Sequence, residues 1–146
     1  MGQTLFTNVK IFDGNSKRSY AGEVLLQGNL VKKVAKGKRK IRANGAEVID
    51  GAGATLMPGL VESHSHVCYT DCATLKDIGR VPVEEHMVIA LENARLMLDH
   101  GFTSLFSAAG VGSPKLRLEP VLRDVINAGR FPGPRIKAAS PEITST

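Results

Sequence analysis

Aromatic residues and cysteines are scarce in this chain of 146 residues, which has no tryptophan, 5% aromatic residues and two cysteines. Two cysteines cannot form the dense disulfide network on which small secreted scaffolds depend, so we expect reduced thiols and an ordinary hydrophobic core. The balance of 42% apolar and 23% charged residues is typical of a soluble globular protein of this length.

Long apolar runs and a targeting segment are also lacking. No stretch approaches the roughly eighteen apolar residues that a membrane span requires. The first ten residues, MGQTLFTNVK, do not have the basic-then-apolar order of a secretion signal. The sequence therefore predicts a cytoplasmic protein that has no membrane partner.

Positive charge is in excess, with a formal net charge of +5, and residues 32–42, KKVAKGKRKIR, contribute seven positive side chains. Nucleic-acid surfaces usually interleave such charges with aromatic rings or place them on a recognisable module, and this segment has neither. Edge lysines also keep sheets from pairing with one another. We therefore expect a solvated loop and strand edge here, and no nucleic-acid partner.

The chain divides into two kinds of pattern. Residues 3–57 read as short strands separated by the turn signals DGN and QGN and by the glycine-rich GAG, with a hairpin about QGN. Residues 58–146 alternate: strands at 59–67, 102–109 and 134–140 flank helices at 83–100 and 116–128, each followed by a glycine, Gly101 or Gly129. Such alternation predicts α/β structure with a parallel sheet.

Two of the four histidines, His64 and His66, lie one residue apart near the end of the first strand of that array. Side chains two apart on a strand point to the same face, and their Cα atoms are then roughly 6 to 7 Å apart. Two imidazoles so placed can bind one divalent ion, for which zinc is the expected metal. A catalytic zinc needs at least three ligands, so others must come from elsewhere.

The segment EVIDGAGATLMPGLVESHSHV, together with NVKIFDGN, ARLMLDHGFTSLF and INAGRFPGPRI, resembles the amidohydrolase superfamily, closest to its imidazolonepropionase and Xaa-Pro dipeptidase-like branch. The resemblance covers nearly the whole chain. It implies a β-sandwich segment at 1–57 and, at 58–146, the first strands and helices of a (β/α)8 TIM barrel. A complete barrel needs about 250 residues, so we expect an N-terminal portion.

The resemblance also implies a function. It predicts a metal-dependent hydrolase that uses metal-activated water to cleave a C–N bond in a small amide, cyclic amide, urea or carbamate. The expected metal is zinc, as one or two ions held in part by His64 and His66. The general base and the remaining ligands would lie beyond Thr146, so the fragment alone should be inactive. Homo-oligomerisation of the full-length enzyme is left open.

Two positions depart from the family pattern. Glu62 stands two residues before His64, where the family usually has Asp, and LFSAAG with Ser107 stands where the dipeptidase-like branch often has Arg-Asp. These departures weaken a peptidase assignment and leave the roles of both residues open.

Alternatives remain at this point. One is a mononuclear deaminase of the same superfamily. Another is a non-catalytic His2Cys2 metal protein, because Cys68 and Cys72 follow closely in HSHVCYTDC, although their spacing is not that of a zinc finger. Alternation would aim Cys68 to the same side as the histidines. His86 and His100, on the first helix and at its end, are expected to be structural.

Overall fold

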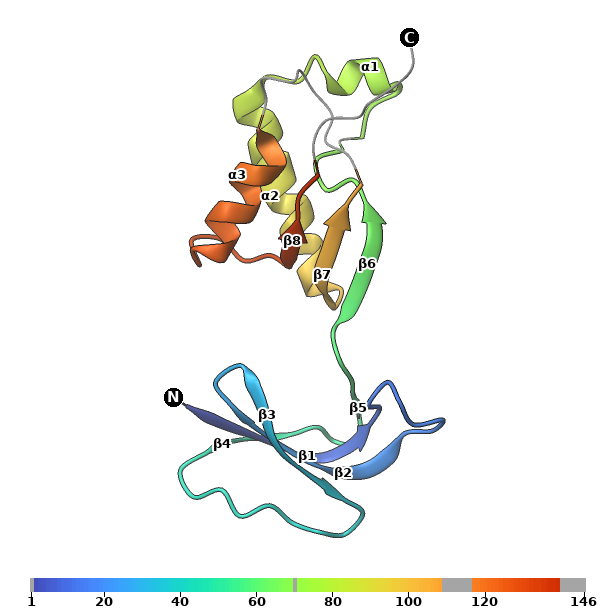
Figure 1. Cartoon of the computed structure of the whole chain (residues 1–146), viewed down its shortest axis with the longest axis vertical. Coiled ribbons are helices and arrows are strands. Elements are labelled where there is room, and N and C mark those ends of the chain that lie inside the picture. Colours follow the sequence, from blue (N-terminus) through green and yellow to red (C-terminus); the bar gives the residue numbers. More distant parts are fainter. Residues whose placement is uncertain (1, 70, 109–116, 140–146) are drawn as a thin grey trace. The chain divides into compact units, whose positions relative to one another are not determined.

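The computed structural model describes residues 2–69, 71–108 and 117–139 (Figure 1). It is mixed α/β with strands dominant, as the sequence predicts, and it divides into two compact units, Met1–Pro58 and Gly59–Thr146. No helix among the described residues is long and apolar enough to cross a membrane.

The first unit is a sheet in the order β3-β2-β1-β4, with β5 also paired to β1. The predicted hairpin about QGN is confirmed, because β2 and β3 are antiparallel and Gly28 has a positive φ of 59°. The strands expected around GAG also form, but β4 and β5 pair in parallel with β1 and not with each other. The element bounds are β1 Gln3–Ile11, β2 Tyr20–Gln27, β3 Leu30–Lys36, β4 Glu47–Asp50 and β5 Thr55–Leu56.

The basic segment 32–42 lies on the edge strand β3 and in the loop that follows it, as expected. Its lysines and arginines are exposed, whereas Ile41 is buried against Leu5 and Leu25. Buried Glu23 anchors this loop, because its carboxylate accepts hydrogen bonds from Lys40 Nζ and the Ile41 amide at 2.8 Å each. Burial raises the pKa of Glu23, but the Lys40 and Ile41 hydrogen bonds outweigh it and the net direction is downward.

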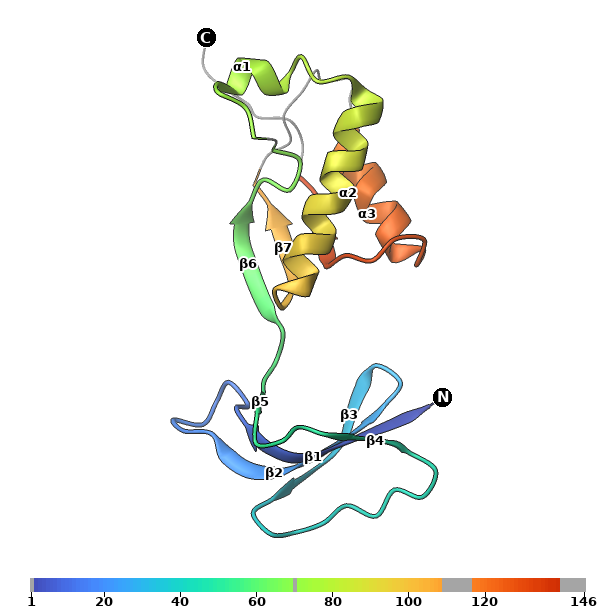
Figure 2. The same cartoon turned by 180° about the vertical axis from the view of Figure 1, so that it is seen from behind.

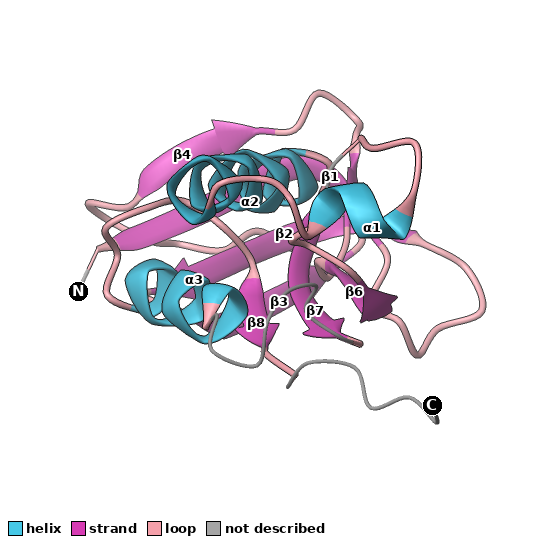
Figure 3. Ribbon diagram, turned by 90° about the horizontal axis from the view of Figure 1, so that it is seen from above, coloured by secondary structure: helices cyan, strands magenta, loops and turns pink. Residues whose placement is uncertain are grey.

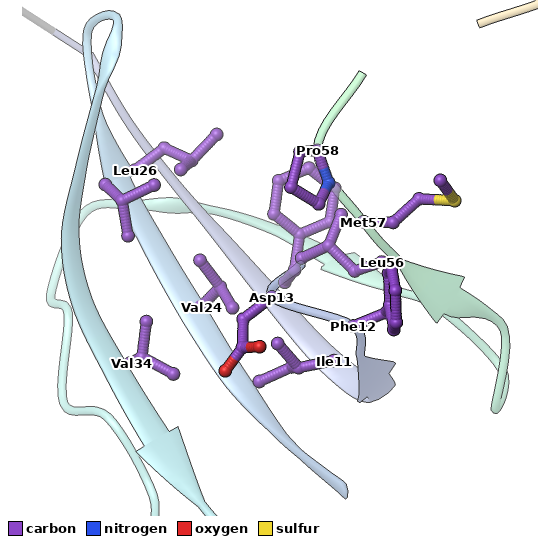
Figure 4. Close-up of a pocket in the computed structure, with 11 residues that line it drawn as sticks. Ile11, Phe12, Asp13, Val24, Leu26, Val34, Leu56, Met57 and Pro58 are labelled. Carbon is purple, nitrogen blue, oxygen red and sulfur yellow. The ribbon is translucent and has the colours of Figure 1, made fainter. Parts of the chain in front are cut away.

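An apolar cavity of about 390 Å³ opens on the first unit (Figure 4). Its single charged lining residue, Asp13, is engaged in a turn, where the Ser16 and Asn15 backbone amides lower its pKa to about 2. The cavity therefore offers apolar surface without a set of convergent polar groups. Its other lining residues are Phe6, Ile11, Phe12, Val24, Leu26, Val31, Val34, Leu56, Met57 and Pro58.

The second unit is a parallel sheet in the order β6-β7-β8, with helices α2 and α3 on one face (Figures 1 and 2). Figure 3 shows α2 and α3 side by side. The predicted parallel α/β array is thus confirmed over the described residues. Its elements are β6 Leu60–Ser65, α1 Leu75–Ile78, α2 Val83–Asp99, β7 Phe102–Ser107, α3 Leu118–Asn127 and β8 Arg135–Lys137.

The two long helices begin and end close to where the sequence predicts. Helix α2 follows Pro82 and carries Glu84 and Glu85 in its first turn, and its end is followed by Gly101 with a φ of 90°. Helix α3 is followed by Gly129 with a φ of 69°. The strands are shorter than predicted. The expected ends of two strands, at residues 109 and 140, and the expected start of the second helix, at residue 116, lie outside the described residues.

The core of this unit lies between the helices and the sheet. On α2, Ala94 is fully buried, and Met87 and Leu91 pack against the core. Ala90, one turn before Ala94, is fully buried as well. Two alanines on the sheet-facing side let the helix approach the strands closely.

The Pro-Gly step before β6 has a packing reason. A Cβ at position 59 would overlap side-chain atoms of Thr103. The next amide, that of Leu60, donates to the Gly101 carbonyl at 2.8 Å. Glycine at 59 therefore allows β6 to begin directly beside β7.

Candidate metal centre

The two histidines lie together where β6 ends. Their ring centroids are 5.2 Å apart with planes at 77°; His64 is exposed and His66 is half-buried. Ser65, between them, is buried on the other side. The expected alternation is therefore confirmed, and both imidazoles are at the carboxyl end of a parallel strand, where α/β folds carry their sites.

Ser65 joins the end of β6 to β7. Its hydroxyl donates to the Phe106 carbonyl at 3.2 Å, and its own carbonyl accepts from the Ala108 amide at 2.8 Å. These bonds fix the backbone that lies between His64 and His66. The relative position of the two histidine Cα atoms is therefore set by sheet pairing.

Glu62 acts on the backbone of His64. Its carboxylate Oε1 accepts a hydrogen bond from the His64 amide at 3.0 Å. The half-buried glutamate thus stabilises the strand at the first histidine. A side chain can reach the backbone amide two residues ahead, which makes this hydrogen bond possible.

The residues after β6 form a turn held from α2. The Tyr69 amide donates to the His66 carbonyl at 2.9 Å, and Asn93 Nδ2 donates to the carbonyls of Val67 at 3.0 Å and Tyr69 at 2.9 Å. The Tyr69 ring packs against the His66 ring with centroids 4.2 Å apart. The sequence did not identify Asn93 or Tyr69 as residues of this region. The signal for Asn93 was a polar amide side chain within an amphipathic helix.

The other two histidines have structural positions. His86, 2% exposed, contacts the Cys68 carbonyl through Nε2. His100 is exposed at the end of α2, where Nδ1 lies 2.8 Å from the Leu96 carbonyl. Neither imidazole belongs to a group of potential ligands among the described residues.

The expectation that Cys68 points to the histidine side is wrong. Cys68 is fully buried in the helix-covered core, because β6 ends at Ser65 and the following turn breaks the alternation. Burial, with a smaller contribution from the Glu119 charge, raises the pKa of the Cys68 thiol to about 12. Zinc binds thiolate, so this environment argues against a His2Cys2 site.

Ser107 and Glu119 form a second buried polar contact at this end of the sheet. Ser107, fully buried at the end of β7, donates its hydroxyl to Oε1 of Glu119, which is 2% exposed in the first turn of α3. The other carboxylate oxygen, Oε2, has no hydrogen-bond partner among the residues that the structure describes. The sequence did not single out Glu119, since an acidic residue early in a helix is ordinarily exposed.

The donor set present fits part of a metal site. Two adjacent imidazoles are suited to zinc and similar ions, and the exposed His64 ring leaves space for an ion and further ligands. Over the described ranges, no group of three or more histidine, cysteine, aspartate or glutamate side chains could hold a metal.

No protein-family model matches the chain. Among curated proteins, the dihydroorotase of Streptomyces coelicolor is 29% identical over 109 residues, covering 75% of this chain and 21% of its own length. The imidazolonepropionase of Treponema denticola is 30% identical over 74 residues, covering 45% of this chain and 18% of its own length. The chain thus spans about a fifth of the length of these relatives.

Solved structures match nearly the whole chain. An amidohydrolase structure superposes with a TM-score of 0.81 at 26% identity, covering 95% of this chain and 32% of that one. A Xaa-Pro dipeptidase with methionine bound in its active site has a TM-score of 0.79 at 28% identity, covering 97% and 34%.

Proposed function

We propose that this chain, which is related to the amidohydrolase superfamily, is the N-terminal part of a metal-dependent hydrolase that cleaves a C–N bond in a small molecule. Its homologues are hydrolases that act on C–N bonds. The observation that carries the proposal is the pair of imidazoles 5.2 Å apart at the carboxyl end of β6.

The proposed architecture places these elements in a larger fold. Strands β6, β7 and β8 with helices α2 and α3 would be the first units of a (β/α)8 barrel, and residues 1–57 would belong to a β-sandwich. The parallel order β6-β7-β8, with both helices on one face, supports the barrel. The other sheet face, which carries His64, would then face the barrel interior.

His64 and His66 would hold a divalent ion, with zinc as the expected metal. When bound, such an ion polarises a scissile carbonyl and lowers the pKa of water so that it can attack near neutral pH. Within this chain, Ser65 holds the backbone between the two ligands through its bonds to Phe106 and Ala108, and Glu62 holds the backbone amide of His64. Further ligands and the general base would come from residues beyond Thr146.

Substitution of each histidine in the full-length protein tests the proposal. His64→Ala and His66→Ala should each abolish hydrolysis of amide, urea or carbamate substrates and lower metal content measured by mass spectrometry, because neither ligand has a substitute within the described residues. His100→Ala, which replaces an exposed histidine at the end of α2, is the control and should retain most metal. Parent-like metal content and activity in either histidine variant would overturn the proposal.

A further inference from the structure

The two proposed ligands are held in different ways. His64 lies within β6, whereas β6 ends at Ser65 and His66 is the first residue of the turn closed by the Tyr69 amide. The pairing of β6 with β7 is irregular between Glu62 and Ser65 and ends at Ser65, so His66 lies just beyond the ladder, whereas the His64 amide is held by Glu62. The His66 ring packs against Tyr69, so its orientation depends in part on the turn at residues 66–69.

Asn93 supplies the contacts that hold this turn from outside the strand. Its side-chain nitrogen donates to the Val67 and Tyr69 carbonyls at 3.0 and 2.9 Å, which uses both amide hydrogens. Both partners are carbonyl oxygens, which can only accept, so the orientation of the Asn93 amide follows from its surroundings. One side chain of α2 thus fixes two peptide groups of the turn.

The second of those peptide groups carries the ring that touches His66. The Tyr69 and His66 rings lie 4.2 Å apart at 31°, and the His66 ring in turn lies 5.2 Å from that of His64. A shift of the Tyr69 backbone would therefore change the surface against which the His66 imidazole packs. The contacts run from Asn93 through the turn to the ring.

We propose that Asn93 is a positioning residue that holds His66 in the orientation needed for metal binding. The inference rests on the proposed function, since it concerns the same pair of ligands. Outer partners of this kind typically change metal affinity by about 10- to 100-fold when they are removed.

Asn93 is a cleaner probe than His86, which also contacts the turn. His86 contacts the Cys68 carbonyl but is almost completely buried, so its removal would leave a cavity. Asn93 is half-buried and borders a small pocket of about 180 Å³ that it shares with His66 and Leu96. Substitutions at 93 therefore remove hydrogen bonds without overpacking the core.

The test measures zinc affinity in the full-length protein by competition with a chromophoric chelator, beside the melting temperature of the metal-free form. Asn93→Asp keeps the size and shape but replaces both donors with acceptors, and Asn93→Ala removes the group. Both should bind zinc about 10- to 100-fold more weakly. Glu92→Ala, an exposed neighbour on α2, is the matched control and should bind as the parent does.

A purely structural role would lower the melting temperature and leave the zinc affinity of the folded protein unchanged. Parent-like affinity in Asn93→Asp and Asn93→Ala would overturn the inference. Asn93→Ser, which keeps one donor, should have an intermediate zinc affinity. If Asn93→Asp and Asn93→Ala do not fold, a parent-like zinc affinity of Asn93→Ser would overturn the inference equally. If His64→Ala and His66→Ala also bind zinc with the affinity of the parent, the proposed function fails. If only the Asn93 variants bind zinc with the affinity of the parent, the proposed function stands and the inference about Asn93 fails.

Discussion

At the scale of single residues, neighbours in sequence have opposite surroundings. Ser65 is buried and bonded to β7, whereas His64 beside it is exposed. Ser107 lies where the dipeptidase-like pattern has Arg-Asp, and its hydroxyl binds a carboxylate supplied by Glu119 of α3. The carboxylate that contacts Ser107 therefore comes from a helix and is buried.

Cys68 should be unreactive in the folded protein. Its thiol is fully buried and its pKa is raised to about 12, so almost no thiolate forms at pH 8, and thiolate is the reactive species. Iodoacetamide should modify Cys68 only after guanidinium unfolding, as measured by peptide mass spectrometry, whereas half-buried Cys72 serves as the internal comparison. Rapid native modification of Cys68 would contradict the burial described.

The same shift has a consequence for stability at high pH. The pKa of the Cys68 thiol is raised from 9.0 to about 12 on burial, so the folded state binds the proton more tightly than the unfolded state. The contribution of this protonated thiol to the free energy of unfolding is complete below pH 9 and is lost as the pH rises towards 12.

At the scale of elements, glycines end the two long helices in the same way. Gly101 and Gly129 have φ values of 90° and 69°, a region that L side chains enter at a cost, and a Cβ on either would meet nothing within 4 Å. Any penalty on substitution is therefore conformational and not steric.

Gly101→Ala and Gly129→Ala should each lower the free energy of unfolding by about 1 to 2 kcal/mol, the usual cost of a left-handed residue with a Cβ. Chemical denaturation of the full-length protein measures the change. Gly79→Ala is the matched control, because Gly79 follows α1 with a φ of −67° and has room for a Cβ. Equal midpoints for all three variants and the parent would show that the backbone at 101 and 129 is not left-handed.

At the scale of the whole molecule, both units leave large apolar side chains exposed. Examples are Val31 and Val48 in the first unit and Val61 in the second, each at least 60% exposed. Strands β3, β4 and β6 are also sheet edges, which can pair with other chains.

Expressed alone, the 146-residue chain should self-associate and show no hydrolase activity. Sedimentation velocity should reveal mass increasing with concentration, because exposed apolar strands favour association. A variant with Val31→Lys and Val61→Lys should associate less, since both side chains are exposed and a charge opposes edge pairing. A monodisperse, cooperatively unfolding monomer of the parent would contradict this expectation.

Local signals in the sequence were sufficient for most elements. The hairpin about Gly28, helix α2 and the glycine ends depend on contacts within a few residues, so turn chemistry and periodicity predict them. The common face of His64 and His66 follows from alternation along one strand. The metal-ligand role of these histidines remains a prediction.

Long-range packing decided what the sequence could not. β4 and β5 pair with β1, about forty-five residues away, so no local pattern could show that their pairing is parallel. Cys68 turns into the core because β6 ends at Ser65, and Asn93 reaches its two carbonyls only because α2 packs beside that turn. Alternation along a strand therefore determined which face the histidines share, while helix packing against the sheet decided what surrounds them.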